Sequence, residues 1–171
     1  MSEQSGGIMM KTVKLILIVN EEQNHQLHTY ACAFKHEVYK IAGVFQKEQR
    51  IFAFPYRYIS NQIAWTSKQQ VVTQAQQYYR LKQRHPTTKL DFMAVWSGES
   101  VVFKESGHIQ FLLGTDQTKR YLIIPFMCDE ELLNVLRCGL LKEVTLKQRG
   151  EHWFAFLHME SRSTSLSDFN V

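Results

Sequence analysis

The chain has 171 residues, 44% hydrophobic and 12% aromatic, which is enough apolar material for one or two compact units and excludes a disordered chain. No apolar run reaches the roughly 20 residues of a membrane-spanning helix, and the first residues lack a signal-peptide pattern, so we expect a soluble, cytoplasmic protein. The net charge is +4, yet residues 49–90 contain seven Lys or Arg and no Asp or Glu. This local excess favours a polyanionic partner, although a solvated basic face without a partner has the same composition.

The first half of the chain predicts a leader, a strand and helices. Residues 1–10 carry turn-prone and polar residues without periodicity and are expected to be a flexible leader, whereas the branched apolar run at 13–19 predicts a buried strand. Asn20 and Gln23 form a capping-box pattern, and apolar residues then recur at helical steps as far as Phe45. A shorter helix is predicted after Pro55, and a third over residues 67–84, which ends before Pro86.

The second half predicts mainly strands, because the apolar period changes toward two after Pro86. A short helix is expected over residues 129–138, with acidic residues at its start and Gly139 at its end. Residues 161–171 are polar and are expected to be a flexible tail. The predicted strands lie near residues 90–96, 100–104, 108–113, 120–126, 142–147 and 152–159, the last two as a hairpin.

This order of elements predicts an α+β fold. A lone first strand cannot satisfy its own backbone groups, so it requires partner strands from later in the chain. We therefore expect a small, OB-like β-barrel formed by residues 11–19 and 90–160. A helical domain of about three helices, residues 20–89, is expected to be inserted between the first strand and the rest.

Four stretches, at residues 13–39, 67–83, 101–126 and 139–160, resemble in order and spacing the amino-terminal part of TnpB (OrfB) proteins. These are RNA-guided nucleases of insertion sequences, related to compact type V CRISPR effectors. The first stretch, VKLILIVNEEQ, resembles the opening strand and helix start, and GLLKEVTLKQRGEHWFAFLHME resembles the closing hairpin. The resemblance implies a wedge barrel and a helical recognition domain that together hold guide RNA and its duplex with target DNA.

The chain departs from the family after Glu160, where the first strand of the RuvC nuclease domain is expected. Asp168 lies near the place of a metal-binding Asp but lacks the flanking glycines, so we assign it to the tail. Two-metal nuclease chemistry requires several carboxylates that converge on one site, and no such set can be assigned from the sequence. We expect a non-catalytic chain, truncated or split before the nuclease domain, with no metal or cofactor.

The sequence gives only weak evidence for metal binding or for a reactive cysteine. The acidic residues 129–131 are explained by their position at a helix start. His25, His28, His36 and Cys32 share one helix, but surface or packing roles are favoured over a zinc site. The three cysteines have no CxxC spacing, and their odd number indicates reduced thiols rather than a disulfide framework.

Nucleic-acid binding needs dispersed cations and aromatic faces rather than one fixed constellation. Basic and aromatic residues alternate in the acid-free window, and the closing hairpin offers a second, smaller basic surface. The alternative is that the tyrosines pack internally and the cations are only solvated. The candidate contacts are Arg50, Tyr56, Arg57, Tyr58, Lys68, Tyr78, Tyr79, Arg80, Lys82, Arg84 and Lys89, with Lys142, Lys147 and Arg149 on the hairpin.

The expected partner is structured RNA, DNA or both, bound in a salt-sensitive and weakly sequence-selective way. The alternative is a protein-interaction subunit that completes a separately encoded RuvC-type nuclease in trans. Neither a membrane nor a small-molecule substrate is expected.

Overall fold

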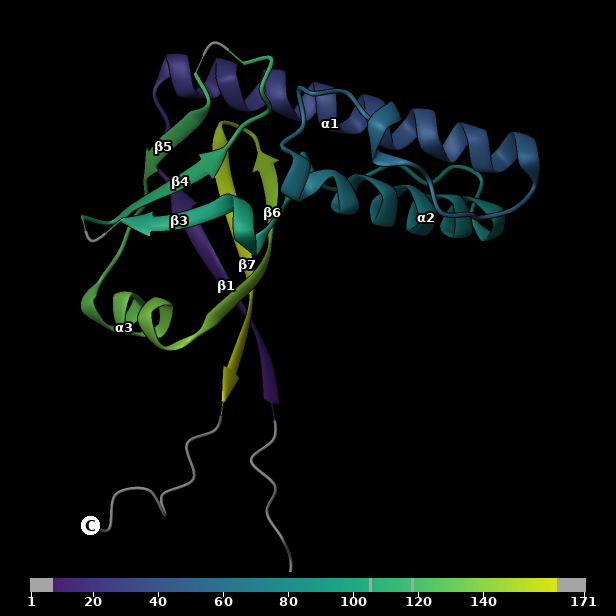
Figure 1. Cartoon of the computed structure of the whole chain (residues 1–171). Coiled ribbons are helices and arrows are strands. Elements are labelled where there is room, and N and C mark those ends of the chain that lie inside the picture. Colours follow the sequence, from purple (N-terminus) through teal and green to yellow (C-terminus); the bar gives the residue numbers. More distant parts are fainter. Residues whose placement is uncertain (1–7, 105, 118, 163–171) are drawn as a thin grey trace, which may run out of the picture.

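The computed structural model describes residues 8–104, 106–117 and 119–162, and Figure 1 shows their arrangement. These residues form a mixed α+β fold with two antiparallel sheets. Residues 1–7 of the predicted leader and residues 163–171 of the predicted tail, including Asp168, lie outside the described residues. The elements are β1 (Ile8–Leu17), α1 (Glu21–Glu48), α2 (Lys68–Arg84), β2 (Ala94–Ser97), β3 (Val101–Lys104), β4 (His108–Leu112), β5 (Tyr121–Pro125), α3 (Glu130–Cys138), β6 (Leu140–Arg149) and β7 (His152–Arg162).

The first strand pairs with the last one, as the sequence predicts. Register partners run from Ile8 opposite Arg162 to Leu17 opposite Trp153, and the sheet continues in the order β1-β7-β6-β2. Residues 8–10 and 161–162 therefore belong to strands and not to the predicted leader and tail. Each of the two ends supplies the other with backbone partners, which explains why the ladder continues to Ile8 and Arg162.

The second sheet has the order β3-β4-β5 and meets the first where β1 ends. Leu17 and Phe126 form an isolated bridge. The Ile18 N–H donates to the Pro125 carbonyl at 2.8 Å, and the Met127 N–H donates to the Ile16 carbonyl at 2.9 Å. Among the described strands, no ladder joins β2 to β3, so the predicted closed barrel is not confirmed.

A short 3-10 turn, η3 (Gly98–Ser100), leads from β2 into β3 and separates the two sheets at this side. Gly98 lies directly against β6: an added Cβ would be 2.0 Å from the Leu141 carbonyl oxygen. Only glycine allows so close an approach of two backbones. This contact helps to explain why the chain turns here instead of continuing as one long strand.

The two long helices extend side by side from the sheets (Figure 1). The predicted capping box is present, because the Gln23 N–H donates to Asn20 Oδ1 at 2.8 Å and the Asn20 N–H donates to Gln23 Oε1 at 2.9 Å. The α1 helix stops at Gln49, whose φ of 55° is left-handed. Gln83 Nε2 donates to Gln46 Oε1 at 2.8 Å, so the carboxyl-terminal turns of α1 and α2 are adjacent.

The predicted helix after Pro55 is wrong. The chain instead forms two single 3-10 turns, η1 (Tyr56–Tyr58) and η2 (Trp65–Ser67). Ser60 Oγ accepts a hydrogen bond from the Gln62 N–H at 3.1 Å, and such a local bond competes with helical hydrogen bonding. Ile59 and Ile63 still reach the core, but from a loop.

One apolar core joins the helices to both sheets. Trp96 of β2 is fully buried between Tyr30 of α1, with ring centroids 4.7 Å apart, and Phe111 of β4, at 4.4 Å. Its indole N–H donates to the Leu112 carbonyl at 3.2 Å. Trp153 of β7 is also buried.

The Glu143→Gln variant should gain stability relative to the wild type as the pH rises. Burial raises the pKa of the Glu143 carboxyl above its usual 4.5, although His158, its register partner, opposes the shift. Between pH 4.5 and the higher pKa of the folded carboxyl, the unfolded carboxyl is more fully ionised than the folded one, so the free energy of unfolding falls as the pH rises. Urea unfolding of both proteins at acidic and neutral pH measures the difference. An equal stability difference at both pH values would contradict this account, and Glu151→Gln, on the exposed turn, is the control.

Candidate nucleic-acid interface

Five cations gather where the two long helices end together, and we call them the basic tip. Arg80, Lys82 and Arg84 lie on the last turns of α2, and all three side chains are exposed. Arg50 follows the end of α1, and Lys89 follows α2 next to Thr88, whose carbonyl accepts from the Tyr78 hydroxyl at 3.4 Å. Cations near helix carboxyl termini are favoured by the helix dipole, so this position has a structural as well as a functional explanation.

The charges of the basic tip are free of partner carboxylates. Within the described ranges, neither the five cations of the tip nor Arg57 has an Asp or Glu oxygen within 4.0 Å. Lys47 and Glu48, in the last turn of α1, add one charge of each sign and leave the balance unchanged. The tip is therefore a cationic surface whose charges are available to a polyanion.

A second group of candidates lies along the loop between the helices. The Arg57 guanidinium stacks 4.9 Å from the Tyr58 ring centroid and donates to the Tyr58 hydroxyl at 3.2 Å. Tyr58 is 58% exposed, so one face of this pair is open to solvent. Tyr56 is half-buried and packs edge-to-face at 5.8 Å on Trp65, an exposed ring that the sequence patterns did not single out.

Tyr78 and Tyr79 are half-buried between the helices. The alternative interpretation, that these tyrosines pack internally, is therefore correct for part of each ring. The Tyr78 ring packs edge-to-face on Tyr39 of α1 at 5.3 Å, and the Tyr79 ring packs on Phe45 at 6.2 Å. Both rings still line an open groove between α1 and α2. Nothing in the sequence pairs Tyr39 with Tyr78, because the loop between the helices has no repeating pattern that sets their register.

Lys68 does not belong to this surface, and its assignment as a nucleic-acid contact is corrected. The residue is 2% exposed, and its ammonium donates to the Ile59 carbonyl at 2.9 Å and to Asn61 Oδ1 at 3.0 Å. Burial lowers the pKa of the Lys68 ammonium, while the charges of Glu37 and Asp116 oppose the shift. Lys68 instead holds the 59–61 loop against α2.

The Lys68→Ala variant should lower the free energy of unfolding by about 1–3 kcal/mol, because the buried Ile59 carbonyl loses its donor. Urea unfolding measures the change. An exposed neighbour, Gln69→Ala, is the matched control and should have little effect. Equal stabilities of Lys68→Ala and the wild type would show that the buried ammonium is not a structural contact.

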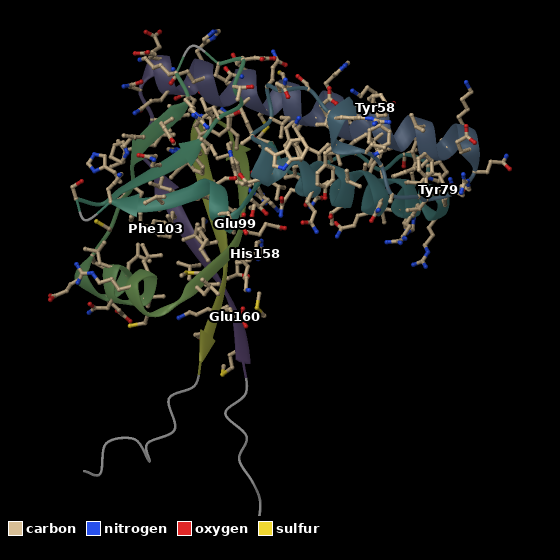
Figure 2. All side chains as sticks on the ribbon, viewed as in Figure 1. Tyr58, Tyr79, Glu99, Phe103, His158 and Glu160 are labelled. Carbon is tan, nitrogen blue, oxygen red and sulfur yellow. The ribbon has the colours of Figure 1, made fainter. Side chains whose placement is uncertain are left out.

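The second predicted surface, on the closing hairpin, is weaker. Lys142 pairs with Glu160 at 3.0 Å, and Lys147 pairs with Asp91 at 3.4 Å, so both charges have local partners. Arg149 is exposed next to the hairpin turn. Figure 2 shows Glu160, the partner of Lys142, on the sheet and Tyr79 on the helical pair, so the structure does not bring Lys142 to the basic tip.

The outer face of the same hairpin carries two aromatic residues that the sequence patterns did not single out. The Lys14 ammonium lies 4.4 Å from the Phe154 ring centroid, and the Lys147 ammonium lies 5.4 Å from that of Phe156. Strict alternation with the buried Trp153 and Ala155 was the available signal, because it places both phenylalanines on the opposite face.

Two of the residues weighed for metal binding have structural roles. Asp129 caps α3 by accepting from the Leu132 N–H at 2.8 Å, and the His28 ring packs on Trp153 at 4.9 Å. Over residues 8–162, apart from 105 and 118, no three His, Cys, Asp or Glu side chains are grouped so as to hold a metal ion. Over the same residues, no helix has the length and apolar character that crossing a membrane requires.

Comparison with known proteins gives no assignment: no protein-family model matches the chain, and no curated protein matches it. The relation to TnpB proteins therefore stays a prediction from the four sequence stretches. The functional argument depends on the surface itself.

Proposed function

We propose that this chain is a non-catalytic nucleic-acid-binding module of the kind that the TnpB resemblance implies, and that its basic tip contacts the phosphate backbone. One observation carries the proposal: five exposed cations lie on the last turns of α2 or follow the ends of the two long helices, and none has a carboxylate partner in the part of the chain that the structure describes. Cations that neutralise phosphates release condensed counterions, which is the main source of affinity in non-specific binding.

The arrangement favours recognition of backbone and shape over base sequence. Its cations are flexible side chains on helix ends, and phosphate contacts carry no direct sequence information. The neighbouring Arg57–Tyr58 pair offers an exposed ring on which an unpaired base can stack. We expect structured RNA with unpaired segments to be a better ligand than a uniform duplex.

We further propose that the two sheets act as the wedge-like barrel to which the helical pair is attached. Two contacts support this. The backbone hydrogen bonds around Leu17 and Phe126 join β1 to β5, and Trp96 of one sheet packs on Phe111 of the other. A base of this kind holds the basic tip away from the sheets, where a large ligand can reach it.

Titration of a labelled, structured RNA across a salt series tests the proposed binding. For five phosphate contacts, the logarithm of the affinity should fall with the logarithm of the salt concentration with a slope of about −4. Absence of binding at low salt, or binding that does not depend on salt, would contradict the proposal.

A second candidate function is that of a protein-interaction subunit completing a separate RuvC-type nuclease. It is favoured by an apolar row on the outer face where the sheets meet: Ile16 is 39% exposed, Ile18 53% and Met127 59%. Co-purification with the product of a neighbouring reading frame tests this candidate. Loss of that complex in an Ile18→Glu, Met127→Glu variant that still binds RNA would support it, and an unchanged complex would contradict it.

A further inference from the structure

A groove of about 580 Å³ lies between α1 and α2, next to the basic tip. Its lining includes the rings of Tyr39, Tyr78 and Tyr79, the Lys82 side chain and the exposed backbone of Gly43. A Cβ added at Gly43 would meet no atom within 4 Å, so the glycine leaves this part of the groove open.

We propose that this groove takes a single unpaired nucleotide of a bound nucleic-acid strand. The inference rests on the proposed nucleic-acid binding. It adds a specific base-binding site, which the charges of the basic tip do not define. Tyr39 is 44% exposed, and its ring stands at 77° to that of Tyr78, so the two rings form a corner with open aromatic surface. Bases stack on aromatic side chains with little dependence on sequence.

The charges around the groove fit a nucleotide better than a neutral or acidic occupant. The Lys82 ammonium lies 5.6 Å from the Tyr78 ring centroid, so a phosphate beside a stacked base would meet a cation. Of the described residues that line the groove, none is acidic. Gln46 and Gln83 bond to each other at 2.8 Å and keep further donors and acceptors for the edge of a base.

Size and access also favour an unpaired nucleotide. The groove volume falls in the usual range of small-ligand sites. A base within a duplex is stacked and paired on both sides, whereas a base in a bulge or loop can be splayed out toward a protein. The adjacent Arg80 and Arg84 are then placed to contact the flanking phosphates.

The test uses two RNA hairpins that differ by a one-nucleotide bulge, with the fluorescent base 2-aminopurine at the bulge. Gly43→Leu fills the groove without changing the charge, and Gly43→Ala is the matched control, because a methyl group there meets open space. Gly43→Leu should weaken binding of the bulged hairpin about tenfold and abolish the fluorescence change, with the plain hairpin unaffected. Tyr39→Leu should have the same selective effect.

The outcomes separate the two proposals. If the wild type binds neither hairpin, the proposed function itself fails. If both hairpins bind and neither Gly43→Leu nor Tyr39→Leu selectively weakens the bulged one, the groove inference fails while the proposed function stands. Tight binding of free adenosine monophosphate without any preference for the bulge would also overturn the inference, because the ligand would then be a free nucleotide.

Discussion

Replacing Arg80, Lys82 and Arg84 together by glutamine will weaken binding of structured RNA at least about tenfold at low salt. The same variant will reduce the slope of log affinity against log salt by about two to three, because each lost phosphate contact removes roughly 0.7 to 0.9 from it. These side chains lie exposed on the last turns of α2, so the substitutions should leave the fold intact. Fluorescence anisotropy of a labelled RNA at several salt concentrations measures both quantities.

The matched control removes three positive charges elsewhere. Lys40, Lys119 and Lys142 each already pair with a carboxylate, respectively that of Glu37, Glu22 and Glu160. Their replacement by glutamine changes the net charge equally but should change the salt slope by less than about one. Equal losses in the two variants would mean that net charge, and not the basic tip, determines binding.

The Trp96→Ala variant should lose about 3–5 kcal/mol of unfolding free energy, the largest stability effect that we expect of any single substitution. Trp96 is fully buried, stacks on Tyr30, packs against Phe111 at a tilt, and donates to the Leu112 carbonyl. Its removal leaves a cavity and an unpaired carbonyl at the point where α1 and both sheets meet. Urea unfolding followed by circular dichroism measures the loss.

An exposed tryptophan provides the control for this substitution. Trp65 is 64% exposed, so Trp65→Ala should cost less than about 1 kcal/mol. The unfolding curve of the wild type also tests the predicted division into a helical domain, residues 20–89, and a barrel domain. A single transition is expected from the shared core, whereas two transitions, only one of them shifted by Trp96→Ala, would contradict a shared core.

Local signals in the sequence were sufficient for most of the elements. The capping box at Asn20 and Gln23 and the alternation in the closing hairpin depend on neighbouring residues alone, and both patterns are present in the structure. The need of a lone first strand for late partners was also enough to predict the pairing of β1 with a late strand. Composition and residue spacing therefore predicted those elements whose structure depends on residues close together in the sequence.

Features that depend on tertiary contacts were not predictable. Lys68 sits in an acid-free basic window, and only the approach of Ile59 and Asn61 shows that its charge is internal. The groove depends on the register of two helices separated by an irregular loop, which no periodicity fixes. The break between the strands at 90–96 and 100–104 was predicted, but the close approach of Gly98 to the Leu141 carbonyl was not, because it joins residues far apart in the sequence.

Ultraviolet cross-linking of a bound RNA that contains 4-thiouridine, followed by mass spectrometry of the peptides, tests the central claim most directly. It reports both whether the chain holds RNA and which surface does so. We predict cross-links in the segment from Arg50 to Lys89, concentrated near Tyr78 and Tyr79, and few on the closing hairpin. Cross-links confined to β6 and β7, or none at all, would contradict the assignment of the basic tip as the nucleic-acid-binding surface.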